Sequence, residues 1–142
     1  MEDIDFTKFD KGVFLVNCLA VVYDKATGKV LIGKRENDQY IKELSWCFPG
    51  GRPDYDDDLE KYLALEVKKK TGLDIDIKKV LFAKTYPEKR QFLAIYYLAE
   101  KTGGTEMPGE KFTELKWVKP EELKTYFTTS LHPKLLEMIN TL

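Results

Sequence analysis

The sequence has few residues of the kinds that form disulfide bridges or bind transition metals. It contains two cysteines and one histidine in 142 residues. Cys18 and Cys47 lie inside apolar stretches and lack the short spacing of a metal-binding pair. We therefore expect both thiols to be reduced and to pack in the interior. His132 has no second histidine with which to build a metal site, and we assign it no role.

The sequence also lacks an excess of charge of one sign and a long hydrophobic run. Lys plus Arg number 23 and Asp plus Glu number 24, for a formal net charge of −1, so binding to nucleic acid through a basic surplus is not expected. The longest apolar run, Val13 to Val22, is interrupted by Asn17 and is shorter than the roughly 18 residues of a membrane span. The acidic start, Met1 to Asp5, does not resemble a secretion signal. These features predict a cytoplasmic protein without a membrane partner, and leave its oligomeric state open.

The composition is that of a folded domain. Hydrophobic residues make up 43% of the chain, aromatic residues 13% and charged residues 33%, which is enough apolar material for a core. The length corresponds to about one domain, since globular domains run to roughly 100–200 residues. We therefore expect residues 1–142 to form a single domain.

Hydrophobic periodicity and turn residues predict the order of the elements. A helix is expected over about residues 58–71, with Asp57 and Glu60 as a capping box and Gly72 as a left-handed C-terminal cap. Pro120 and Pro133 each begin a short helix. Strands are expected at 13–23, 30–35, 46–48, 73–82, 92–98 and 115–118, with loops at 86–90 and 102–109. This order indicates one mixed α/β domain.

Residues 51–73 resemble the Nudix box of the Nudix hydrolase superfamily. In that motif a glycine and a glutamate are followed by Arg-Glu-aliphatic-any-Glu-Glu-any-Gly-aliphatic. The matching positions here are Gly51, Asp57, Leu65, Glu66, Val67, Lys69, Lys70, Gly72 and Leu73. The frame therefore fits the motif, but two of its glutamates are replaced by lysines and its arginine by a leucine.

Flanking segments support the same alignment. Such families show a strand like 31–35, a Trp-any-Phe-Pro-Gly-Gly segment like 46–51, and a late Trp-Val before an acidic helix start like 117–123. The resemblance thus covers about residues 13–140. It implies the Nudix fold, an α/β/α sandwich with a mixed central sheet, and it implies hydrolysis of nucleoside diphosphates linked to another group, with Mg²⁺ or Mn²⁺ as cofactor.

The substitutions bear on that activity. Positions 66, 69 and 70 are spaced i, i+3 and i+4, so their side chains meet on one helix face. Three glutamates there would provide oxygen ligands for a divalent cation, whereas an ammonium has no lone pair to offer. We therefore predict a degenerate box that is catalytically weak or inactive. The carboxylates that could persist in a divergent, Mg²⁺- or Mn²⁺-dependent site are Glu66 and Asp57, as catalytic and metal-binding groups, and Asp54 as a further ligand.

Other residues are candidates for binding a nucleotide or a nucleoside diphosphate derivative. The basic groups Lys69 and Lys70 could supply the charge of the missing cations, although a helix C-terminus also favours solvated lysines. Arg35 could bind phosphate, and the rings of Tyr40 and Tyr86 could stack on a base, but the sequence favours a structural or exposed position for each of them. Gly50 and Gly51 shape the turn beside the box.

Three functions remain open on these grounds. The first is a Nudix-fold protein with a degenerate box that retains ligand binding. The second is a divergent metal-dependent pyrophosphohydrolase that uses Asp54, Asp57, Glu66 and a late glutamate from among Glu106, Glu110 and Glu114. The third is a protein-interaction domain that binds no nucleotide.

Overall fold

The computed structural model describes residues 5–8, 10–36, 38 and 44–142. No helix in these segments is long and apolar enough to cross a membrane. The strands are β1 (Leu15–Asp24), β2 (Lys29–Arg35), β3 (Trp46–Cys47), β4 (Gly50–Gly51), β5 (Leu73–Tyr86), β6 (Lys89–Gly104) and β7 (Phe112–Val118). The helices are η1 (Phe6–Lys8), α1 (Leu59–Thr71), η2 (Pro120–Glu122), α2 (Leu123–Tyr126) and α3 (Pro133–Asn140).

One mixed sheet forms the centre of the molecule. Its main strand order is β3-β2-β1-β6-β5, while β4 pairs with β1 and β7 pairs with β2. β1 and β6 run parallel, from Leu15 opposite Phe92 to Tyr23 opposite Glu100. The other pairings are antiparallel. The apolar run of β1 is therefore explained by its central position, where both faces of the strand are covered.

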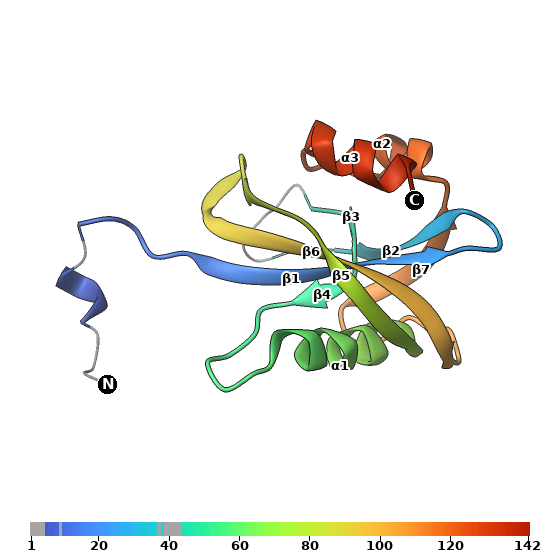
Figure 1. The fold of residues 1–142 in the computed structure, drawn as a ribbon, viewed down its shortest axis with the longest axis horizontal. Coiled ribbons are helices and arrows are strands. Elements are labelled where there is room, and N and C mark those ends of the chain that lie inside the picture. The colour runs from blue at the N-terminus through green and yellow to red at the C-terminus, as the bar shows by residue number, and fades with distance from the viewer. Residues whose placement is uncertain (1–4, 9, 37, 39–43) are drawn as a thin grey trace.

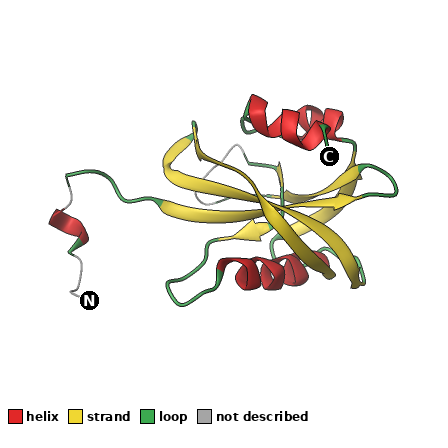
Figure 2. Ribbon diagram, in the orientation of Figure 1, coloured by secondary structure: helices red, strands yellow, loops and turns green. Residues whose placement is uncertain are grey.

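Helices cover the two faces of this sheet (Figures 1 and 2). α1 packs on one face through Leu63 and Val67, against the β1 residues Cys18, Ala20 and Val22. The C-terminal helices cover the other face, where Leu135, Leu136 and Ile139 of α3 pack in one core with Leu19 and Val21. Because neighbouring residues of a strand point to opposite faces, β1 contributes to both cores. The predicted α/β/α sandwich with a mixed sheet is confirmed.

The hairpin of β5 and β6 is longer than its sequence pattern predicts. The loop expected at 86–90 is only a tight turn, because Tyr86 pairs with Lys89. The loop expected at 102–109 begins only after Gly104, which pairs with Leu73 and has φ +86°. β7 likewise begins three residues earlier than expected, at Phe112. Polar residues continue these ladders because one side chain in two can point to solvent, so the end of an apolar run does not mark the end of the strand.

α1 begins and ends at two caps. Asp58 is the N-cap and accepts a hydrogen bond from the Lys61 N–H at 3.0 Å. Gly72 adopts φ +75° and donates its N–H to the Lys68 carbonyl at 2.9 Å, as predicted. The prediction that Asp57 caps the helix is wrong, because the Asp57 carboxylate accepts the N–H of Asp54 at 2.7 Å in the preceding turn. The helix therefore starts one residue later, with its middle turns facing β4.

Candidate functional site

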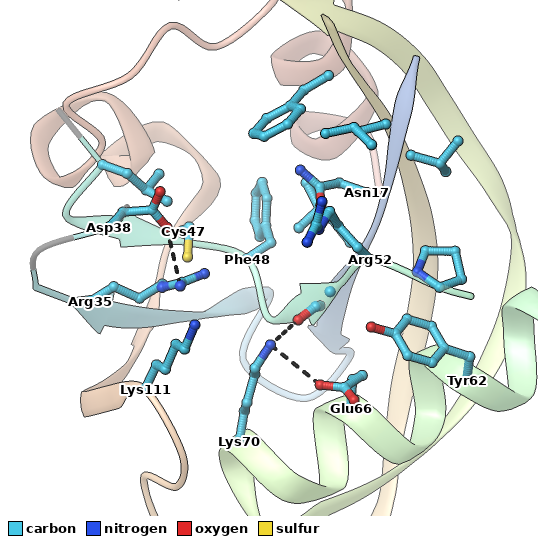
Figure 3. Close-up of a pocket in the computed structure, with 18 of the residues that line it drawn as sticks. Asn17, Arg35, Asp38, Cys47, Phe48, Arg52, Tyr62, Glu66, Lys70 and Lys111 are labelled. Carbon is cyan, nitrogen blue, oxygen red and sulfur yellow. Dashed lines mark hydrogen bonds and ion pairs between the residues drawn. The ribbon is translucent and has the colours of Figure 1, made fainter. Parts of the chain in front are cut away.

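A cavity of about 640 Å³ lies beside β4 and the start of β1. Its walls come mainly from β1, β4, α1 and the residues just before β7 (Figure 3), and β2, β3, β5, β6 and β7 contribute one residue each. Charged and aromatic side chains share the lining. The basic residues are Arg35, Arg52, Lys70 and Lys111, the acidic ones are Asp38, Asp54, Glu66 and Glu110, and the aromatic ones are Phe48, Tyr55, Tyr62, Tyr86, Phe92 and Phe112.

The two glycines of β4 allow the strand to lie against both β1 and α1. Gly50 pairs with Leu19, and a Cβ atom at position 50 would lie 1.9 Å from the Cys18 carbonyl oxygen. A Cβ atom at Gly51 would lie 2.4 Å from the Tyr62 hydroxyl. No larger residue fits either position without movement of the neighbouring atoms. This close approach brings the β4 backbone to the middle of α1.

Lys70 and Glu66 occupy the interface of α1 with β4. The Lys70 ammonium donates to the Gly50 carbonyl and lies 3.4 Å from Oε2 of Glu66 (Figure 3). Both side chains are largely buried, with 9% of Lys70 and 14% of Glu66 exposed. Lys69 lies on the outer side, where 57% of its side chain is exposed and its Nζ is 3.5 Å from Oε1 of Glu66. Each carboxylate oxygen of Glu66 is therefore paired with an ammonium.

These residues do not fit a divalent cation bound by α1. The i+3 and i+4 neighbours of Glu66 are cations that already engage both of its oxygens. Asp54 and Asp57 are exposed and form hydrogen bonds within their own turn. Among the described residues, no group of three or more His, Cys, Asp or Glu side chains is placed to hold a metal ion. A metal ion at this position would need oxygen ligands that the helix does not offer.

The other predicted site residues fall in different places. Arg35, at the end of β2, lines the cavity, and its guanidinium lies 3.1 Å from Oδ2 of Asp38. Tyr86 lines it as well, but as a buried wall residue with 8% exposure rather than as part of an open loop. Lys69 and Asp57 are not part of the lining. Tyr40 lies outside the described residues.

Two hydroxyls and a thiol in this lining stay protonated at neutral pH. Burial, and secondarily the nearby Glu66 carboxylate, raises the pKa of Tyr62 to about 12. Burial also raises the pKa of Tyr86, and its contacts with Tyr96 raise it further. Burial raises the pKa of the Cys47 thiol to about 11. These groups therefore offer neutral hydrogen-bond donors and apolar surface to the cavity.

Several lining residues were missed in the sequence. Arg52 directly follows Gly51, and Lys111 stands in the last turn before β7, but nothing in the local sequence places them together. Asn17 offered a signal, since it is the polar residue that interrupts the apolar run of the central strand. A polar side chain at such a position is explained when it faces a cavity.

The sequence matches a known protein family over most of its length. A family model described as NUDIX domain matches residues 13–139. The chain belongs to the Nudix family. This confirms the resemblance seen in the box and its flanking segments. No curated protein matches the chain.

Solved Nudix structures share the fold. The chain is similar to the MutT protein from Methanosarcina mazei, with 18% identity, coverage of 94% of this chain and 97% of the other, and a TM-score of 0.72. It is similar to an ADP-ribose pyrophosphatase from Streptococcus suis, with 19% identity, coverage of 89% and 90%, and a TM-score of 0.70. It is also similar to a UDP-X diphosphatase, with 14% identity, coverage of 98% and 72%, and a TM-score of 0.67. At these identities the likeness establishes the Nudix fold alone.

Proposed function

We propose that this Nudix protein binds a nucleotide or another nucleoside diphosphate derivative in its cavity and hydrolyses such compounds slowly or not at all. One observation carries the second half of the proposal: Lys69 and Lys70 pair with both oxygens of Glu66 on the helix face where the box would present carboxylates. A carboxylate bridged in this way is a poor ligand for Mg²⁺ or Mn²⁺ and a poor base for activating a water.

The residues that line the cavity support the proposed binding of a nucleotide or nucleoside diphosphate derivative. Arg35, Lys70 and Lys111 line the cavity, and guanidinium and ammonium groups bind phosphate oxygens. The rings of Phe48 and Phe92 give the same cavity an apolar, aromatic wall suited to a base. Two of the structural neighbours are named for ADP-ribose and UDP-X, which supports a nucleoside diphosphate derivative as the ligand class. We place this function in the cytoplasm.

The proposal is tested by measuring turnover and binding on one panel of compounds. ADP-ribose, NADH, dinucleoside polyphosphates and nucleoside triphosphates are incubated with the protein in Mg²⁺ and in Mn²⁺, and the same compounds and ADP are titrated by calorimetry. We expect binding of at least one compound with little or no hydrolysis.

Two results would overturn the proposal in favour of a named alternative. Rapid metal-dependent turnover that Glu66→Gln abolishes, and that the exposed Glu137→Gln does not, would show a divergent pyrophosphohydrolase. Asp54, Glu66 and Glu110, which line the cavity, would then be its first candidates. Absence of binding across the whole panel would favour an interaction domain without a nucleotide ligand.

A further inference from the structure

Lys70 is unusual among the lysines of α1 because its charge is buried. The residue is 7% exposed, although it stands in the last turn of the helix, where lysines ordinarily extend into solvent. Its Nζ contacts two oxygens, the backbone carbonyl of Gly50 and the carboxylate of Glu66. One is a fixed dipole of β4 and the other is a full negative charge. Both are hard oxygen atoms of the kind that bind a divalent cation.

We propose that the Lys70 ammonium is a built-in cation that takes the place of a metal ion between Gly50 and Glu66, so that phosphate binding in the cavity requires no divalent metal. This inference rests on the proposed binding function and specifies how the site achieves it. It also separates the two lysines of the box, because Lys70 lines the cavity and Lys69 lies on the exposed side of Glu66.

The number of hydrogen-bond donors on an ammonium supports this assignment. Lys70 has three N–H donors; the Gly50 carbonyl accepts one of them, and Oε2 of Glu66 is an ion-pair partner at 3.4 Å. Since Lys70 also lines the cavity, a remaining N–H of its ammonium is assigned to a phosphate oxygen. The side chain is held by burial and by its two oxygen partners, so little rotamer freedom is left to lose when a ligand binds.

The contact between Lys70 and Glu66 also disfavours the binding of a divalent cation at Glu66. A metal ion that approached Oε2 of Glu66 would displace the ammonium or lie within a few ångströms of it. Displacement would leave Lys70 charged in a buried position without its partners, and coexistence would bring like charges together at short range. Lys69 adds a second positive charge at the other oxygen of Glu66. The two lysines thus neutralise the carboxylate without a metal.

Two measurements on the 142-residue chain test the inference. The first is the affinity for ADP, by calorimetry, in excess EDTA and in excess Mg²⁺. The second is the binding of Mn²⁺ alone, followed through the electron paramagnetic resonance signal of the free ion. For the unmodified protein we expect the same ADP affinity in both buffers and no Mn²⁺ binding above that of the exposed carboxylates.

Variants at Lys69 and Lys70 test which of the two lysines binds the phosphate. Lys70→Met removes the ammonium at similar length, and should lower the ADP affinity in EDTA by about tenfold or more, since a hydrogen bond to a charged group is lost. It should also allow Mn²⁺ to reach Oε2 of Glu66 and the Gly50 carbonyl, measured as weak Mn²⁺ binding that the unmodified protein lacks. The matched control Lys69→Met should change the ADP affinity by no more than about twofold, because its charge is exposed. Lys70→Gln, which keeps a donor for the Gly50 carbonyl, replaces the Met variant if that variant fails to fold.

The outcomes separate this inference from the proposed function. ADP binding by the unmodified protein that disappears in EDTA would overturn the inference and leave the proposed function intact, as would tight Mn²⁺ binding at Glu66 while Lys70 is present. Failure of the unmodified protein to bind ADP or any panel compound would instead overturn the proposed function, and with it the phosphate role of Lys70. The Mn²⁺ titrations would still show whether Lys70 excludes a metal ion from Glu66.

Discussion

Glu88 and Ser130, 42 residues apart in the sequence, are joined by two hydrogen bonds to one carboxylate. The Ser130 N–H donates to Oε1 of Glu88 at 2.7 Å, and the Ser130 hydroxyl donates to Oε2 at 3.3 Å. Glu88 lies in the turn between β5 and β6, and Ser130 lies between α2 and α3. The pair therefore joins one end of the sheet to the C-terminal helical layer.

This contact should make stability depend on pH. Partial burial by itself raises the pKa of Glu88, but the hydrogen bonds from Ser130 and from the Glu88 backbone N–H, together with the positive charge of Lys84, lower the pKa below its ordinary value of 4.5. A carboxylate with a lowered pKa stabilises the fold above its unfolded-state pKa, and this contribution is lost as the pH falls through the folded-state value. We expect Glu88→Gln to lower Tm at pH 7, and the difference from the unmodified protein to shrink below about pH 4.5.

Ser130, which donates both hydrogen bonds to Glu88, provides a matched control for that pH effect. Ser130→Ala removes the hydroxyl bond at 3.3 Å and keeps the shorter backbone bond, so its effect on Tm at pH 7 should be the smaller of the two. A Tm difference for Glu88→Gln that stayed constant from pH 7 to pH 3 would contradict the proposed linkage.

Removing the carboxylate of Glu66 should destabilise the fold through Lys70. In Glu66→Gln the ammonium stays buried against the Gly50 carbonyl without its counter-charge. We expect the free energy of unfolding, measured in urea, to fall by about 3 kcal/mol. Glu137→Gln, the same change at an exposed position of α3, should alter it by no more than about 0.5 kcal/mol. Equal values for the two variants would show that the buried pair contributes no specific stabilisation.

The close packing of β4 against β1 predicts that a larger residue at Gly50 will destabilise the fold. Gly50→Ala would place its Cβ 1.9 Å from the Cys18 carbonyl oxygen, so β4 would have to move away from the central strand. We expect a loss of about 3 kcal/mol in the free energy of unfolding. Gly12→Ala is the control, because no atom lies within 4 Å of the place that its new Cβ would take and its φ is not positive. Similar stabilities for the two variants would indicate that β4 has room to shift.

The layers of the fold could be predicted from local patterns. The apolar spacing of Leu63 and Val67 and the cap at Gly72 predicted a helix over 58–71, and the structure has it over Leu59–Thr71. Pro133 and the apolar residues after it predicted the last helix in the same way. These features are local, because they depend on residues within one or two turns of each other. The lengths of β5 and β6 were not predicted, since pairing between distant strands extends both past their apolar cores.

The cavity could be predicted only in part. The box pattern indicated that Glu66, Lys69 and Lys70 share a helix face, and their ion pairs confirm this. The local sequence gave equal support to a solvated basic helix end for both lysines, and that interpretation is wrong for Lys70. Its burial depends on a backbone carbonyl of β4, 20 residues away, whose approach requires two glycines. Contacts of this kind arise from tertiary packing and leave no periodic signal in the sequence.

A final prediction concerns the return of metal binding. The four changes Asp57→Glu, Leu65→Arg, Lys69→Glu and Lys70→Glu restore the residue types of the box. Glu66 already faces the cavity, so the new glutamates would add oxygen ligands at its i+3 and i+4 positions. Leu65 is 62% exposed, which leaves room for an arginine that would reduce repulsion among the acids. We expect this variant to bind Mn²⁺ at least about tenfold more tightly than the unmodified protein, since several charged oxygen ligands are gained.

The matched control for the four-residue variant keeps Lys70 and carries the other three changes. It should gain little Mn²⁺ affinity, because the buried ammonium still engages Glu66 and the Gly50 carbonyl. Turnover of ADP-ribose should recover less than metal binding, since catalysis also requires a water and a substrate held in the right geometry. Calorimetric titration with Mn²⁺ distinguishes the two variants. Equal affinities would mean that Lys70 does not exclude a metal ion from this position.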